Sequence, residues 1–163
     1  MPKSEAHKLI GTIAGGVGAA GYGLYCQNDR ENIWQFALGG AIGGYTTSRL
    51  ADILEPSKTL GPNHRGLFHG IAFNGAVSVL SYHPLEKWFQ SLVDEANDFD
   101  NRGENLRAFL NKLIVGFMIG TLGGHASHLL ADLVFSKKRL PLYSLIRIVY
   151  PSNSASFVPY VED

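Results

Sequence analysis

Cysteine and charge are both scarce in this chain. Its 163 residues include one cysteine, Cys26, which excludes an intramolecular disulfide and a cysteine-based zinc site. Charged residues make up 17% of the sequence, below the roughly 25% typical of soluble domains. Acidic and basic residues balance to a formal net charge of zero. A neutral chain has no overall electrostatic attraction for nucleic acid, so we expect no nucleic-acid partner.

Two common sequence signals are also missing. The glycine clusters do not form the G-x-x-x-x-G-K-S/T loop that cradles nucleotide phosphates, so nucleotide hydrolysis is not expected. The segment Met1–Lys8 is short and polar, and no clear cleavage site follows it, so we expect no removable signal peptide. Cys26 lies in an apolar stretch, where a lone cysteine usually serves as a small buried hydrophobe. Catalysis by a nucleophilic cysteine or serine therefore has no support.

Apolar segments dominate what is present. The first, Leu9–Cys26, runs for about 18 residues without a charge, near the shortest length that crosses the hydrocarbon core of a bilayer. Three more apolar segments follow it: Ile33–Ser48, Leu67–Tyr82 and Leu110–Phe135. We therefore predict an all-α protein, a compact bundle of four transmembrane helices.

Glycine is abundant, at 19 residues, and recurs at a spacing of four. In a membrane, small residues four apart let two helix backbones approach closely. Such pairs occur in three of the four segments: Gly11 with Gly15, Gly39 with Gly43, Gly40 with Gly44, Gly116 with Gly120, and Gly120 with Gly124. Glycine faces left over after bundle formation would suit a homo-oligomer. The competing interpretation is a glycine-rich helical core of a soluble protein.

The basic residues predict an orientation. With four spans and both termini on one side, that side holds most of the lysines and arginines, which marks it as cytoplasmic. The acidic segment between His83 and Arg107 would then be an outward-facing loop, with an amphipathic surface helix around Leu85–Leu92. We expect a membrane domain over residues 1–140. Residues 141–163 would form a C-terminal extension with a turn at Pro151–Ser154 and an end that is extended on the surface or disordered.

Histidines and acids gather at one end of this predicted bundle. They lie at the start of the first segment, after the second, at the start of the third and near the end of the fourth: His7, Asp52, His64, His69, His128 and Asp132. In an up-down-up-down bundle all of these ends are cytoplasmic. Ionisable groups at membrane depth are costly, so they normally face the bundle interior and pair there.

The types of side chain in this group predict a metal site. His128 and Asp132 are four residues apart and share a helix face. Imidazole and carboxylate together favour zinc, with iron or manganese as alternatives. We predict His64, His69, His128 and Asp132 as ligands, joined by His7, with Asp52 available for ligation or as a general base. His125 is a rival ligand or an outer partner, whereas His83 is assigned to the core or the surface.

The motifs around these residues resemble a known family. His64-Arg65-Gly66-Leu67-Phe68-His69 and Gly124-His125-Ala126-Ser127-His128-Leu129-Leu130-Ala131-Asp132 follow Asp52 and the early His7 in the order found in the YdjM-like bacterial inner-membrane proteins. Those proteins are described as metal-dependent hydrolases, and some as LexA-binding. The sequence departs from the family pattern at two places, since Leu54 replaces a second aspartate and Phe68-His69-Gly70 replaces T-H-S.

The resemblance implies a multi-pass, metal-dependent hydrolase of the bacterial inner membrane, and it gives no substrate. The expected position of the site at the lipid boundary favours a phosphoester or lipid-like substrate at the cytoplasmic face. Membrane lipids would be its partners, and Arg65 would hold an anionic group of the substrate. An alternative is a non-catalytic membrane scaffold or interaction subunit in which the histidines and acids form a structural hydrogen-bonded network. The departures from the family pattern favour that alternative. A third interpretation is a bundle that binds haem through two axial histidines.

Overall fold

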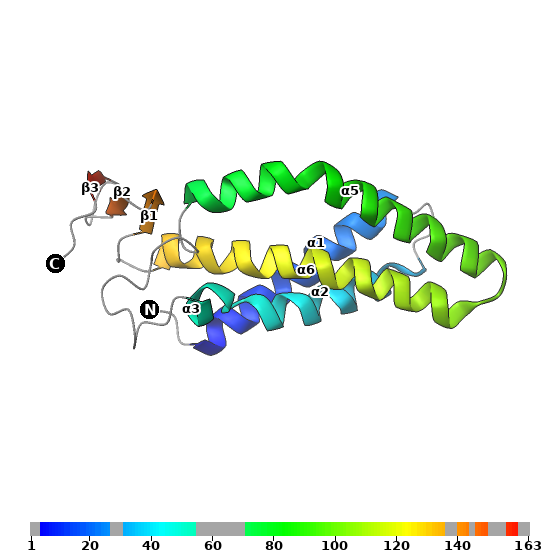
Figure 1. Ribbon diagram of the computed structural model, residues 1–163. Coiled ribbons are helices and arrows are strands. Elements are labelled where there is room, and N and C mark those ends of the chain that lie inside the picture. The colour runs from blue at the N-terminus through cyan, green and yellow to red at the C-terminus, as the bar shows by residue number, and fades with distance from the viewer. Residues whose placement is uncertain are drawn as a thin grey trace.

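The computed structural model describes residues 4–26, 31–54 and 71–135, together with three short strands nearer the C-terminus. Five helices make up the described body: α1 (Ser4–Cys26), α2 (Ile33–Thr47), α3 (Leu50–Leu54), α5 (Ile71–Asn101) and α6 (Asn105–Phe135). They run alternately up and down, so that the start of α1, α3, the start of α5 and the end of α6 lie at one end (Figure 1). The predicted helical bundle is confirmed, and the helix ends match the apolar segments to within about five residues except at the end of α5.

Three helices, α1, α2 and α6, form the centre of the bundle through layers of small residues. In one layer, a methyl group placed on Gly15 of α1 would overlap the carbonyl oxygen of Gly40 in α2 and would lie 3.1 Å from the Cα of Gly120 in α6. The layer one turn nearer the α3 end contains Gly11, Gly44 and Gly124, where a methyl on Gly11 would lie 2.6 Å from the carbonyl oxygen of Gly44. The glycine spacing seen in the sequence therefore brings three backbones into contact.

Larger apolar side chains form a core at the other end of the bundle. Phe36 of α2 is fully buried there, next to Val115 of α6. α5 joins this core through Phe89 and Val93, which are also buried. The first half of α5 is different, because residues 75–80 are all exposed. Pro84 separates the two halves and removes a backbone hydrogen bond inside the helix.

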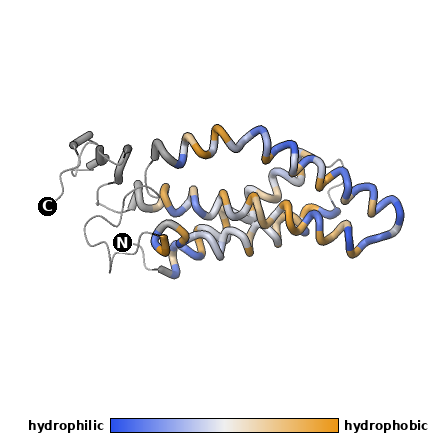
Figure 2. Tube along the Cα trace, viewed as in Figure 1, coloured by the Kyte–Doolittle hydropathy of each residue, from blue (hydrophilic) through white to orange (hydrophobic). Residues whose placement is uncertain are grey.

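The segment after His83 corrects one prediction. It was expected to be a loop carrying a surface helix, but α5 continues without a break to Asn101 and returns in α6 after a tight turn. Gly103 in that turn has a φ of 74°, a conformation that glycine adopts readily. The structure replaces the predicted loop with a long helical hairpin, whose outer part carries most of the hydrophilic residues of α5 (Figure 2).

Residues near the C-terminus differ from the expected extended or disordered tail. Strands β1 (Leu140–Tyr143), β2 (Ile146–Val149) and β3 (Ser156–Pro159) form an antiparallel sheet in the order β1-β2-β3. The sheet is an addition to the all-helical body that the sequence pattern did not predict, because strands of four residues are too short to show a periodicity of their own.

Two helices are long and apolar enough to cross a membrane: α1 over Glu5–Cys26 and α6 over Asn105–Ala131. The core helix of a soluble protein passes the same test, but most of such a helix is buried. Here only 22% of the apolar window in α1 and 33% of that in α6 are buried inside the molecule. Most residues of both windows are therefore not buried inside the molecule.

Candidate functional site

His7 and His128 come together at the end of the bundle that carries α3. His7 lies in the first turn of α1, and His128 lies about two turns before the end of α6. Their ring centroids are 4.5 Å apart, with an angle of 46° between the ring planes. His128 is 1% exposed and His7 is 5% exposed, so both imidazoles are enclosed by protein.

Asp52 brings a carboxylate to the same place from a third element. It lies in α3, and its Oδ1 is 3.7 Å from Nε2 of His128. This distance is longer than a direct hydrogen bond but short enough for electrostatic attraction to a protonated imidazole. About a third of the Asp52 side chain is exposed, so the carboxylate lies between the buried histidine and the surface.

The glycine layers explain why these side chains meet. His7 precedes Gly11 by four residues on α1, and His128 follows Gly124 by four on α6. Residues four apart lie on the same face of a helix, so the two histidines form the next layer beyond Gly11, Gly44 and Gly124. The helix backbones touch in the glycine layer and therefore remain close in the histidine layer. The two imidazole rings fill the narrow space between α1 and α6 there.

Hydroxyl groups surround this layer, and they were not among the predicted site residues. Ser48 is fully buried one turn beyond Gly44, and Ser127 is buried next to His128. Thr47 donates a hydrogen bond from its hydroxyl to the carbonyl oxygen of Thr121, with 3.0 Å between the two oxygens. This bond connects α2 to α6 near the glycine layer next to the histidines. The four-residue spacing Gly40, Gly44, Ser48 was a signal for the serine, because it continues the glycine face of α2.

His125 belongs to a separate contact. Its Nε2 lies 2.7 Å from the side-chain oxygen Oδ1 of Asn74, in the first half of α5. α6 therefore carries one histidine next to α5 and, one turn later, another next to α1. His83, assigned to the core or the surface from the sequence, is on the surface, with 83% of its side chain exposed.

The remaining predicted site residues are not described by the structure. His64, Arg65 and His69 fall in the range 55–70, which lies outside the described residues. Asp132 belongs to α6, one turn after His128, but its side chain is outside the described set. Within the described ranges, no group of three or more histidine, cysteine or acidic side chains is arranged to hold a metal ion. The described residues thus bring together His7, Asp52 and His128 only.

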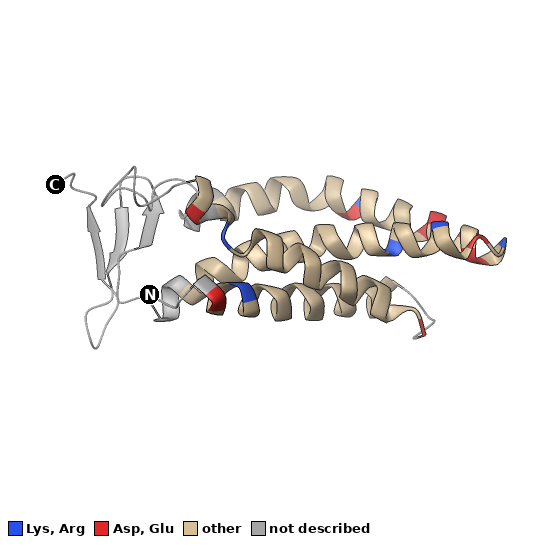
Figure 3. Ribbon diagram, turned by 90° about the horizontal axis from the view of Figure 1, so that it is seen from below, with Lys and Arg blue, Asp and Glu red and all other residues tan. Residues whose placement is uncertain are grey.

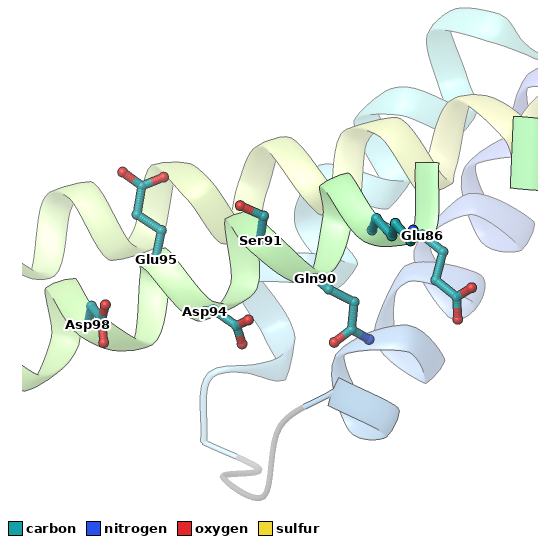
Figure 4. Close-up of a pocket in the computed structure, with 7 residues that line it drawn as sticks. Glu86, Gln90, Ser91, Asp94, Glu95 and Asp98 are labelled. Carbon is teal, nitrogen blue, oxygen red and sulfur yellow. The ribbon is translucent and has the colours of Figure 1, made fainter. Parts of the chain in front are cut away.

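A second polar feature lies at the opposite end of the bundle. An open groove runs along the outer half of α5 (Figure 4). Its lining is mainly acidic and amide or hydroxyl side chains, with one lysine: Glu86, Lys87, Gln90, Ser91, Asp94, Glu95 and Asp98. The groove is lined by residues of the outer half of α5 alone, so it does not belong to the candidate site of His7 and His128.

Comparison with known proteins returns no relative: no protein-family model, curated protein or solved structure matches the chain.

Proposed function

We propose that this protein is a membrane-bound, metal-dependent hydrolase that acts on a phosphoester or lipid-like substrate at the cytoplasmic face of a bacterial inner membrane. The observation that carries the proposal is the meeting of His7, Asp52 and His128, which come from three separate helices. Imidazole and carboxylate are ligand types that zinc accepts. The three described side chains are not themselves arranged as a metal site, so the proposal needs further ligands from residues outside the described ranges. A buried group of this kind at one end of a helical bundle is suited to chemistry at a membrane surface.

The exposed apolar side chains support insertion into a membrane. Along α1 they follow a stripe on the outer face, and a second stripe runs along α2. The members on α1 are Leu9, Ile13, Val17 and Leu24, and those on α2 are Trp34, Leu38, Ile42 and Tyr45. In water these stripes would be an unusually large apolar surface, whereas in a bilayer they would contact lipid. We propose four spans, formed by α1, α2, the first half of α5 and α6, with both termini cytoplasmic.

The metal site we propose extends the described cluster with side chains that lie outside the described residues. His64 and His69, in the segment between α3 and α5, and Asp132, one turn beyond His128, would complete the ligand set. The donor chemistry fits zinc first, with iron or manganese as alternatives. This assignment agrees with the resemblance to the YdjM-like proteins, which places the same residue types in the same order.

A metal held there would supply a hydroxide nucleophile by lowering the pKa of a bound water towards neutrality. The residues of the chain have their own tasks. Asp52, partly exposed beside His128, would accept a proton at its carboxylate. Arg65 would hold the anionic part of the substrate through its guanidinium group. The enclosed imidazoles would keep a fixed orientation, because the glycine layers behind them leave no room for movement.

Metal content tests this proposal directly. The protein is purified in detergent, and bound zinc, iron and manganese are measured for the wild type and for the variants His64→Ala and His128→Ala. The matched control is His83→Ala, which removes an exposed histidine outside the cluster. We expect stoichiometric metal in the wild type and in the control. In the two variants, the affinity for the metal should fall at least tenfold, which is the usual effect of removing a metal ligand or a residue that orients one. Unchanged metal content in both variants would contradict the proposal.

One observation favours a second function, that of a non-catalytic membrane scaffold. His7, Asp52 and His128 connect α1, α3 and α6, and Thr47 connects α2 to α6, so the polar groups hold four elements together. A purely structural network needs no metal. It predicts a wild-type protein without stoichiometric metal, and variants of His7 or His128 that lose stability while showing no change in any hydrolytic activity.

A further inference from the structure

The end of the molecule opposite His7 and His128 has a sharp boundary in charge. Along α5, no aspartate, glutamate, lysine or arginine occurs from Ile71 to Leu85, and then Glu86 and Lys87 begin a charged segment that continues to Asp100. Along α6, the charged residues near the hairpin turn end at Lys112, and the next one is Asp132 at the far end of the helix. Figure 3 shows acidic and basic residues gathered on the projecting part of the α5–α6 hairpin.

Four exposed aromatic side chains lie near this boundary, on three helices. They are Tyr25 of α1, Trp34 of α2, and Tyr82 and Trp88 of α5, and each is between 46% and 77% exposed. Amphipathic aromatic rings of this kind are enriched where a membrane surface meets water. Their exposure would be unfavourable in water for the tryptophans, but suits the headgroup region of a bilayer.

Contacts between the end of α1 and the middle of α5 bring Tyr25 and Trp88 to a similar level. Tyr22 packs edge-on against Phe89, with centroids 6.0 Å apart, and so connects the last turn of α1 to α5 next to Trp88. Tyr25 lies 6.4 Å from Tyr22 on the same helix. Gln90 donates a hydrogen bond to the sulfur of Cys26, with 3.6 Å between the atoms. The end of α1 is therefore level with the middle of α5.

The part of the hairpin beyond this level has its own stabilising contacts. Lys112, which is 1% exposed, forms an ion pair with Asp100 across the hairpin. Asn111 donates a hydrogen bond to Glu95 over 3.2 Å, and Arg107 pairs with Glu104 at the turn. Its outer face, including the acidic groove of α5, is exposed. These charges would cost several kcal/mol each in hydrocarbon but little in water.

We propose that Tyr25, Trp34, Tyr82 and Trp88 bind the lipid headgroup layer on the side of the membrane opposite the histidine cluster, and that the tip of the hairpin, Glu95–Arg107, stands in water beyond that layer. The partner of this aromatic surface is a bilayer, because the apolar stripes lie on one side of it and the charged hairpin on the other. The inference rests on the membrane insertion that is part of the proposed function, but not on the metal site.

The depth of the two tryptophans tests this arrangement. Trp34 and Trp88 are the only tryptophans in the chain, so Trp34→Phe and Trp88→Phe each leave one fluorescent reporter. The full chain is reconstituted into vesicles containing lipids brominated either near the headgroup or near the chain end. We expect both reporters to be quenched at least about twofold more by the shallow label than by the deep one, as for residues at the interface.

The outcomes separate the two proposals. If one reporter is quenched mainly by the deep label, or if Trp34 alone is quenched, the protein is in the membrane and the aromatic surface is wrongly placed. If neither tryptophan is quenched by any lipid, both this inference and the membrane insertion fail. Metal binding is measured separately and is unaffected by either result.

Labelling of introduced cysteines gives a second test on the same helix. In a Cys26→Ser background, Asp98→Cys and Val79→Cys place thiols at two exposed positions of α5, one on each side of the charge boundary. A membrane-impermeant maleimide should label Asp98→Cys readily and Val79→Cys about tenfold more slowly, because a thiol in lipid forms little of the reactive thiolate. Equal labelling rates at the two positions would overturn the proposal.

Discussion

The imidazole rings of His7 and His128 lie 4.5 Å apart, although one residue is near the start of the helical body and the other is near its end. Only the close approach of α1 and α6 allows this contact. Gly11, Gly15, Gly120 and Gly124 create that approach, since each would collide with a neighbouring backbone if it carried a methyl group. The candidate site therefore depends on the close helix packing that the glycine layers allow.

The glycine layers predict a large difference between two neighbouring glycines of α1. Gly15→Ala should destabilise the protein by about 2 kcal/mol or more, because the new methyl group overlaps backbone atoms that cannot rotate away. Gly18→Ala is the matched control, since no atom lies within 4 Å of a methyl group there. The control should be neutral or stabilising by about 0.5 kcal/mol through helix propensity. Unfolding in SDS titrations measures both, and equal effects would contradict the layers.

The two clustered histidines should behave as a unit in stability. With metal removed by chelation, His128→Ala should lower the free energy of unfolding by about 2–4 kcal/mol, as expected when a large buried side chain is deleted. His7→Ala should be less than additive with it, because each removes the same ring contact. The exposed control His83→Ala should change stability by less than about 0.5 kcal/mol. Strict additivity would show that the rings do not interact.

The buried lysine of the hairpin predicts an unequal response of two acidic residues. Asp100→Asn leaves the charge of Lys112 without its ion-pair partner in a buried position, which should destabilise the hairpin by about 2–3 kcal/mol. Glu104→Gln breaks exposed pairs with Arg102 and Arg107, and should cost less than about 1 kcal/mol. Hydrogen exchange of the hairpin amides reports the two values. Similar losses for both variants would show that the burial of Lys112 has no energetic consequence.

The contact between Asn74 and His125 should hold the first half of α5 in place. In Asn74→Leu, amides of residues 74–81 should exchange about tenfold faster, since the hydrogen bond to α6 is lost. Residues 89–96 should be unchanged, because Phe89 and Val93 remain in the apolar core. The matched variant Asn111→Leu removes a hydrogen bond in the outer hairpin and should leave residues 74–81 unaffected. A uniform effect along α5 would refute the separate behaviour of its two halves.

The sequence predicted the helices well, because long apolar runs with regular small residues have few other solutions. It also predicted that His7, Asp52 and His128 would lie at one end, since that follows from an alternating up-and-down path. The sequence did not predict the continuation of α5 to Asn101. The outer half of α5 is mostly polar, and its apolar stripe, which includes Phe89 and Val93, is too short to be recognised as a helix face of the bundle. The partner of His125 was equally hidden, since nothing in the sequence relates Asn74 to it.

Backbone contact among α1, α2 and α6 has a consequence for transport. Where Gly15, Gly40 and Gly120 meet, the three helices touch along their common axis and leave no side chains that could move aside. No ion or solute can travel between these three helices without prising them apart. These three helices therefore form a closely packed support without a channel between them, and this support positions the side chains at its ends.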